Sequence, residues 1–235
     1  MPKRDPFKRH RFPPEVILLA VRWYCRYPLS YRDVRDLLGE RGIHVDPATI
    51  NRWVVKFGPE IAKRSFTHRS WRGLTWHVDE TYVRVGGKWR YLWRAVDHRG
   101  QLVDFRLTAR RDAKAAKAFL RQAKDNARLY QPMTIVTDKA PTYARVIEDW
   151  NKRNFLDDPI LHVDRKWRNN IVESDHAALK RLTTPGKGFQ SLRTAKATLK
   201  GIEAIRTIKR GHVTGRQIGI TGEVSFVNGL FGLAA

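Results

Sequence analysis

The sequence predicts an α/β domain, with a mixed five-stranded sheet and flanking helices, preceded by an all-α helical domain. Residues 15–57 place apolar side chains at helical spacing. Residues 74–107 change to strand-like segments that are separated by two tight turns, Gly86–Gly87 and residues 97–100. From residue 112 onward, helical segments alternate with short apolar runs, as in a sheet whose strands are connected by helices.

The helical domain is predicted over residues 15–66, after a basic N-terminal arm over residues 1–14. Ser30 is a suitable N-cap for the second helix. Asp46, followed by Pro47 at the first helical position, begins the third helix. We expect the arm to be flexible and able to lie on phosphates, because it is basic and terminal.

The third helix, residues 48–57, separates an apolar stripe from a polar side. The apolar stripe comprises Ile50, Trp53, Val54 and Phe57. The polar side comprises Thr49, Asn51, Arg52 and Lys56. Three short helices at this spacing predict a helix-turn-helix, in which the third helix reads DNA. Asn and Arg suit adenine and guanine edges, and Lys suits phosphate. The alternative is a helical bundle that only packs or dimerises.

The α/β domain is predicted over residues 67–190. Residues 58–73 are predicted to form a linker or a continuation of the third helix. The elements follow the order β-β-β-α-β-α-β-α, which is that of the ribonuclease H-like fold. The strands are predicted at 74–85, 88–96, 101–107, 134–137 and 160–163, and the helices at 112–130, 142–154 and 169–181. Residues 191–235 are predicted to form a C-terminal helix over 192–210 and a Gly-rich tail without assigned structure.

The charge of the chain points to a polyanionic partner. Its 46 basic and 23 acidic residues give a formal net charge of +23, spread through folded segments, which favours nucleic acid. The one cysteine, Cys25, excludes an intrachain disulfide and a cysteine zinc cluster. The apolar runs are too short for a membrane span or a signal peptide. We therefore expect a cytoplasmic, DNA-associated protein without a membrane partner.

Three carboxylates are candidate ligands for a hard divalent cation. Asp79 lies on the first strand, Asp138 follows the fourth strand, and Glu173 lies on the helix at 169–181. Mg²⁺ prefers oxygen ligands and needs few protein carboxylates. Glu80 should point to the other face of the strand, because side chains alternate. Asp175, two residues from Glu173 on a helix, should point away from it.

Two other metal sites are weighed against the carboxylates. A zinc site of His77, His162 and His176 is an alternative that the neighbouring residues do not favour. Glu173 and His176 have the spacing found in di-iron bundles, but those require a second such motif and a four-helix frame. We expect His176 to line the site, to contact phosphate or to cap locally.

Two basic residues near Glu173 are candidates for binding phosphate. Lys180 lies seven residues beyond Glu173, which places both on one face of a helix. Arg181 follows it. We expect Lys180 and Arg181 to position a DNA backbone, whereas a solvated basic face remains the alternative.

These motifs resemble those of DDE transposases of bacterial insertion sequences, and in particular the insertion-sequence-six, cointegrate-forming family. The matching segments contain Asp79 in Trp76–Val83, Asp138 in Thr137–Pro141 and Glu173 in Arg168–His176, with 34 residues between the last two carboxylates. The resemblance covers roughly residues 10–210. It implies that the triad is catalytic, that two Mg²⁺ ions bind, with Mn²⁺ as a substitute, and that transposition is replicative.

The expected activity is cleavage at terminal inverted repeats and joining of the 3′-OH to target DNA by two-metal phosphoryl transfer. Two element ends must be held together, so we expect a homodimer or larger homo-oligomer. The alternatives are a ribonuclease H-like nuclease that cuts without joining, and a catalytically silent DNA-binding regulator.

Overall fold

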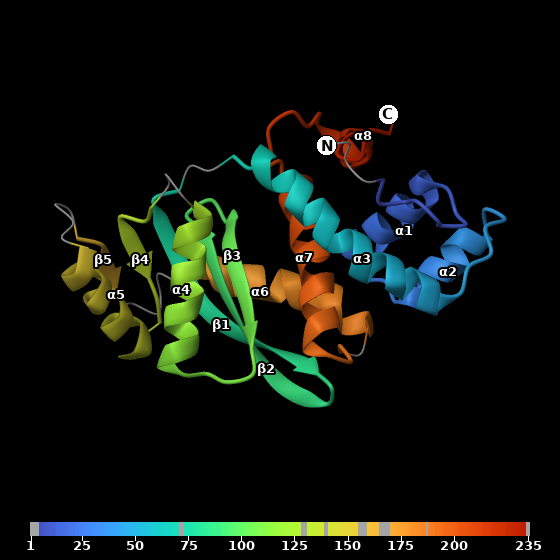
Figure 1. The fold of residues 1–235 in the computed structure, drawn as a ribbon. Helices are drawn as coiled ribbons and strands as arrows, with labels where there is room; N and C mark the ends of the chain where they lie inside the picture. Colours follow the sequence, from blue (N-terminus) through green and yellow to red (C-terminus); the bar gives the residue numbers. More distant parts are fainter. Residues whose placement is uncertain are drawn as a thin grey trace. The chain divides into compact units, whose positions relative to one another are not determined.

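The computed structural model describes residues 5–70, 73–127, 131–138, 141–154, 159–164, 170–186 and 188–233. The chain divides into two compact units, shown in Figure 1. The first unit comprises Met1–Arg69, Thr184–Gly186 and Arg193–Ala235, and the second comprises Ser70–Thr183 and Lys187–Leu192. Among the described residues, no helix combines the length and the apolar character needed to cross a membrane.

The first unit is helical, and local sequence signals set the ends of its N-terminal helices. Ser30 and Asp33 form a capping box, in which each side chain accepts a hydrogen bond from the other's backbone N–H. The Asp46 side chain accepts a hydrogen bond from the backbone N–H of Thr49 and so caps the third helix. The elements are α1 (Pro14–Arg26), α2 (Tyr31–Gly39), α3 (Pro47–Ser65), η1 (Phe66–His68), η3 (Thr184–Gly186), α7 (Leu192–Lys209) and α8 (Gly219–Gly229).

Helix α3 continues to Ser65, beyond the predicted end at residue 57, so part of the segment left open in the sequence is helical. Its Gly58 contacts Gly201 of α7 closely: a Cβ added to Gly201 would lie 2.8 Å from the Gly58 Cα. The C-terminal helices thus belong to the same unit as the N-terminal ones, although they are distant in sequence. The buried face of α7 explains this, because Leu199, Ile202 and Ile205 are almost fully buried.

Two contacts in the first unit were not foreseen from the sequence. Phe7, inside the basic arm that we expected to be flexible, is buried and stacks on Phe57 with ring centroids 4.7 Å apart. Helix α8 lies in the tail that received no assignment, and its buried Glu223 accepts hydrogen bonds at 2.9 and 3.0 Å from Arg26 of α1. An aromatic contact therefore attaches Phe7 to α3, and a buried ion pair attaches α8 to α1.

The second unit contains a five-stranded sheet with the order β3-β2-β1-β4-β5. The first three strands are antiparallel, and β4 and β5 run parallel to β1. Gly86 and Gly87, both with positive φ, form the tight turn between β1 and β2 that the sequence predicts. The strands are β1 (Thr75–Val85), β2 (Lys88–Asp97), β3 (Leu102–Thr108), β4 (Thr134–Val136) and β5 (Leu161–Val163).

Helices cover both faces of this sheet (Figure 1). Helices α4 (Ala113–Ala127) and α5 (Pro141–Asn154) pack on one face, where Trp76, Trp93 and Phe119 belong to one buried apolar cluster. Helix α6 (Asn170–Thr183) packs on the other face through Val172. The strand order and the two helical layers confirm the predicted ribonuclease H-like fold. The first residue of the helix predicted at 169–181 falls outside the described residues.

Candidate active site

The first predicted carboxylate, Asp79, lies in the middle of β1 on the face covered by α6. Its cross-strand partner on β2 is Arg94. Strand alternation sends the preceding Val78 into the core beneath α4 and α5. The side chain of Asp79 is 18% exposed and therefore lies mostly in the interior, with an opening to solvent.

The second carboxylate, Asp138, lies two residues beyond the end of β4 and is half-buried. The parallel register pairs His77 of β1 with Val136 of β4. Asp79 and Asp138 each lie two residues further along these strands. The pairing of β1 with β4 therefore brings the two aspartates to equivalent positions on neighbouring strands.

The third carboxylate, Glu173, is an exposed residue in the first turn of α6. The same helix contacts Asp79 directly through His176, whose Nδ1 lies 3.6 Å from Asp79 Oδ2. Its Asp175 forms a buried ion pair with Arg94. As predicted, Asp175 points away from Glu173, because Asp175 is buried against its partner on β2 whereas Glu173 is exposed.

Electrostatics links the three carboxylates. Burial raises the pKa of Asp79 to about 7, and the negative charges of Glu80, Asp138 and Glu173 add to this effect. A bound cation would relieve such repulsion, so the donor set suits a hard divalent metal. In the part of the chain that the structure describes, no three Asp, Glu, His or Cys side chains stand in metal-binding geometry, so the carboxylates would have to move closer together around a cation.

Glu80 lies on the opposite face of β1, as strand alternation predicts. Its carboxylate accepts a hydrogen bond from the Tyr143 hydroxyl at 2.7 Å and forms an ion pair with Arg111. Burial and the charge of Glu80 raise the pKa of Tyr143 well above its usual value. These contacts join the strand to α5 and to the segment before α4, directly beside Asp79.

The histidines do not gather around one point. His162 of β5 contacts the Thr137 hydroxyl through Nε2 at 2.9 Å, and burial lowers its pKa. His176 contacts Asp79, and His77 is buried on β1. The described residues therefore contain no three-histidine zinc site.

The polar residues predicted to read DNA lie on α3 in the first unit. Arg52 is exposed and donates to the Thr49 hydroxyl at 2.6 Å, and Thr49 donates in turn to Asp46 at 2.6 Å. Asn51 is half-buried. Lys56 is exposed, but it donates to the carbonyl of Pro6 at 2.8 Å, which ties it to the N-terminal segment.

Lys180 and Arg181 are exposed in the last turn of α6, on the helix that carries Glu173. Their exposure agrees with a role at the surface.

The sequence reasoning did not identify Arg94, Arg111 and Tyr143 as neighbours of the site. One signal was present, because Arg94 interrupts an apolar strand and a buried arginine needs a partner. Its acid, Asp175, shares the buried face of α6 with Val172 and Leu179. The pairing crosses 81 sequence positions, which local patterns do not reveal.

Comparison with known proteins places these features in a family. A family model described as a DDE domain, of the IS240 transposase type, matches residues 73–212. A Staphylococcus aureus transposase for the insertion sequence-like element IS431mec is 36% identical, with 90% of this chain and 92% of the relative covered. The S. aureus transposase of insertion sequence IS257 in transposon Tn4003 is equally similar, at 36% identity over the same shares of both chains.

Among solved structures, the catalytic core of HTLV-2 integrase with magnesium aligns in a dimeric and a trimeric form. The TM-scores are 0.41 and 0.44, at 18% and 16% identity, with 63% and 64% of this chain and 93% and 95% of the integrase chains covered.

The DDE-domain match spans more than half of the chain, and the 36% identity extends over 219 residues. Each of these two findings is sufficient to assign the family. The chain therefore belongs to the insertion-sequence-six family of DDE transposases, and it is a polynucleotidyl transferase.

Proposed function

We propose that this transposase binds the terminal inverted repeats of its element, cleaves at the element end and joins the resulting 3′-OH to target DNA. The observation that carries the proposal is the register of β1 with β4, which places Asp79 and Asp138 at equivalent positions, together with the contact of α6, the helix of Glu173, with Asp79. The partly buried Asp79 and Asp138 and the exposed Glu173 of α6 would form an acidic cluster around a bound cation. Such a cluster is unfavourable unless a cation neutralises it.

The three carboxylates are the residues that would hold two Mg²⁺ ions, or Mn²⁺ in their place. When bound, such a pair stabilises the attacking and the leaving oxygen of an in-line phosphoryl transfer. The other residues orient the ligands: His176 contacts Asp79, and Arg94 and Asp175 connect β2 to the helix of Glu173. Lys180 and Arg181 would contact the phosphates of the DNA end.

The helices α1–α3 are proposed to recognise the inverted repeat, with Asn51 and Arg52 near base edges and Thr49 and Lys56 near phosphates. Support comes from the exposed Arg52, which Thr49 holds in place on the solvent side of α3. Replacing Arg52 with Ala should cost about 1–3 kcal/mol of binding to the repeat if it contacts a guanine, and should relax specificity at one base pair. Because α3 packs on α7, binding is measured with the full chain.

Both DNA ends must react in one complex, so we propose that the active form is a homodimer or a larger homo-oligomer. The decisive assay supplies a pre-cleaved terminal repeat with a free 3′-OH, supercoiled target DNA and Mg²⁺. A transposase joins the two, with no other protein present. Cleavage without joining would identify a nuclease, and repeat binding without either reaction would identify a regulator.

A further inference from the structure

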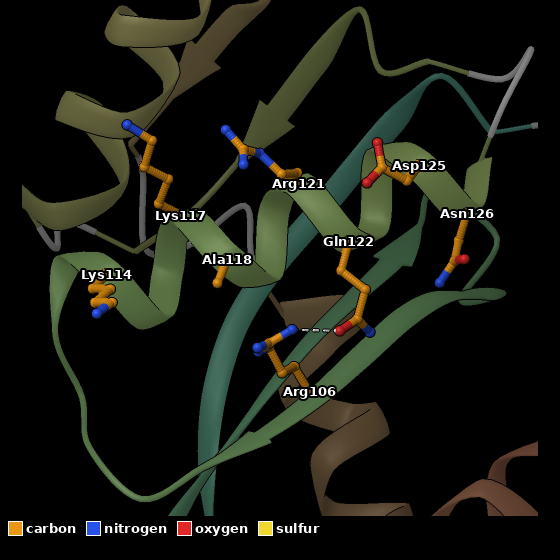
Figure 2. A pocket seen from close by; sticks show the side chains of 8 residues that line it. All are labelled: Arg106, Lys114, Lys117, Ala118, Arg121, Gln122, Asp125 and Asn126. Atoms are coloured by element: carbon orange, nitrogen blue, oxygen red, sulfur yellow. Dashed lines mark hydrogen bonds between the residues drawn. The ribbon is translucent and has the colours of Figure 1, made fainter.

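The outer side of α4 and the neighbouring strand β3 form a depression of about 530 Å³ in the second unit (Figure 2). Four basic side chains line it, and one acidic side chain accompanies them. The lining residues are Arg106, Lys114, Lys117, Ala118, Arg121, Gln122, Asp125 and Asn126.

A hydrogen-bond network fixes the floor of this depression. Arg106 of β3 donates a hydrogen bond through Nη1 to Gln122 Oε1 at 2.7 Å (Figure 2). Gln122 donates to Asp104 Oδ2 at 2.8 Å, and Asn126 donates to the same oxygen at 2.9 Å. The amide groups of Gln122 and Asn126 are thus engaged within the protein, and the guanidinium is held beside α4 before any ligand arrives.

Three cations on α4 extend the basic surface along the helix. Lys114, Lys117 and Arg121 are spaced three and four residues apart, so they share one face. Lys114 and Arg121 are exposed, and Lys117 lies 3.8 Å from Asp149 of α5, a loose ion pair. The face is about 10 Å long at 1.5 Å per residue, which corresponds to about three phosphates along one DNA strand.

The basic face begins near β1, on the face of the sheet opposite to Asp79. Helix α4 starts at Ala113, two residues after Arg111. Arg111 is paired with Glu80, the neighbour of Asp79 on β1. The N-terminal end of α4 thus lies close to the strand that carries Asp79, on the other face of the sheet.

We propose that this surface, Arg106 together with Lys114, Lys117 and Arg121, binds the phosphate backbone of the target duplex. Its chemistry favours contacts with phosphates over base reading, because its amide side chains are engaged by Asp104. Binding without sequence readout suits a target, whereas an element end must be recognised by its sequence. The inference rests on the proposed function, since only a joining enzyme needs a second duplex.

The test combines Lys114→Gln, Lys117→Gln and Arg121→Gln in the full-length protein. A control variant carries Lys196→Gln, Lys200→Gln and Lys209→Gln, three exposed positions on α7 that remove the same charge. Affinity for a random-sequence duplex is measured over a series of salt concentrations, and joining is measured with a pre-cleaved end against increasing target concentration. Melting of both variants checks that the fold is intact.

We expect the α4 variant to lose about tenfold or more in affinity for random duplex, and to lower the salt slope by about two to three. The target concentration for half-maximal joining should rise by a similar factor, while joining at saturating target and binding of the terminal repeat stay near wild type. Equal losses of duplex affinity in the α7 control would show that the effect comes from the lower net charge alone, and would overturn the proposal. A change of oligomeric state with unchanged duplex binding would assign the surface to a second copy of the chain. If the wild-type protein does not join at all, the proposed function fails, whereas unchanged duplex binding by the α4 variant contradicts only this inference.

Discussion

Arg94 on β2 and Asp175 on α6 form a buried ion pair, with side chains 0% and 3% exposed, next to the predicted active site. Arg94 is the cross-strand partner of Asp79, and Asp175 lies two residues after Glu173. The pair thus connects the strand beside the first carboxylate to the helix that carries the third.

Removal of one member of this pair should destabilise the protein strongly. We expect Asp175→Asn to lower the free energy of unfolding by about 3–5 kcal/mol, because the charge of Arg94 is then buried without compensation. The double variant Arg94→Met with Asp175→Leu should recover most of this loss, since it removes both charges. Chemical denaturation of the wild type, of Arg94→Met, of Asp175→Leu and of the double variant measures the coupling. Additive losses in the double variant would argue against a compensated pair.

His176 should tune the carboxylate site through Asp79, from which its Nδ1 is 3.6 Å distant. Loss of a residue that orients a metal ligand typically costs about 10–100-fold in metal affinity or activity. We therefore expect His176→Gln to raise the Mg²⁺ concentration for half-maximal joining by that factor, with recovery at high Mg²⁺. An unchanged Mg²⁺ dependence, in a variant that melts like the wild type, would mean that the contact is incidental.

The close contact of α3 with α7 predicts that a larger residue at Gly201 lowers the stability of the protein. A Cβ at Gly201 would lie 2.8 Å from the Gly58 Cα and 3.1 Å from the Cys25 Sγ. Because backbone atoms cannot yield as a flexible side chain can, Gly201→Ala should cost roughly 1–3 kcal/mol of stability. The matched control is Gly39→Ala, where nothing lies within 4 Å of the new methyl group. Similar stability of both variants would show that the helices separate easily.

Lys180 should bind DNA without supporting the fold, because it is exposed in the last turn of α6. Lys180→Ala should leave the free energy of unfolding within about 0.5 kcal/mol of wild type. It should reduce joining strongly and lower the salt slope of end binding by about one. Melting and joining are measured on one preparation, and a large loss of stability with normal joining per folded molecule would show that Lys180 is structural.

Local sequence signals predict most elements of this fold, because capping residues, glycine turns and apolar periodicity act over a few positions. The Ser30–Asp33 box and the Gly86–Gly87 turn are examples. Helix α8 was missed because its glycines and small polar residues give a weak helical pattern, and its anchor, Glu223, depends on Arg26, 197 residues away.

The same limit applies to the site. Asp79, Asp138 and Glu173 are recognisable from their spacing and from the elements that carry them. The partners of Glu80 and of Arg94 are not, because Arg111, Tyr143 and Asp175 approach only when the sheet and its two helical layers have formed.

The central claim is that three carboxylates act as one metal-dependent site, and joining by isosteric variants tests it most directly. Asp79→Asn, Asp138→Asn and Glu173→Gln keep the shape of each side chain but remove a charged oxygen ligand. The control is Glu148→Gln, an exposed carboxylate paired with Lys152 on α5. With a pre-cleaved end and Mg²⁺, we expect each triad variant to lose joining while it still binds the terminal repeat, and the control to join normally. Near wild-type joining by any one of the three would contradict the account.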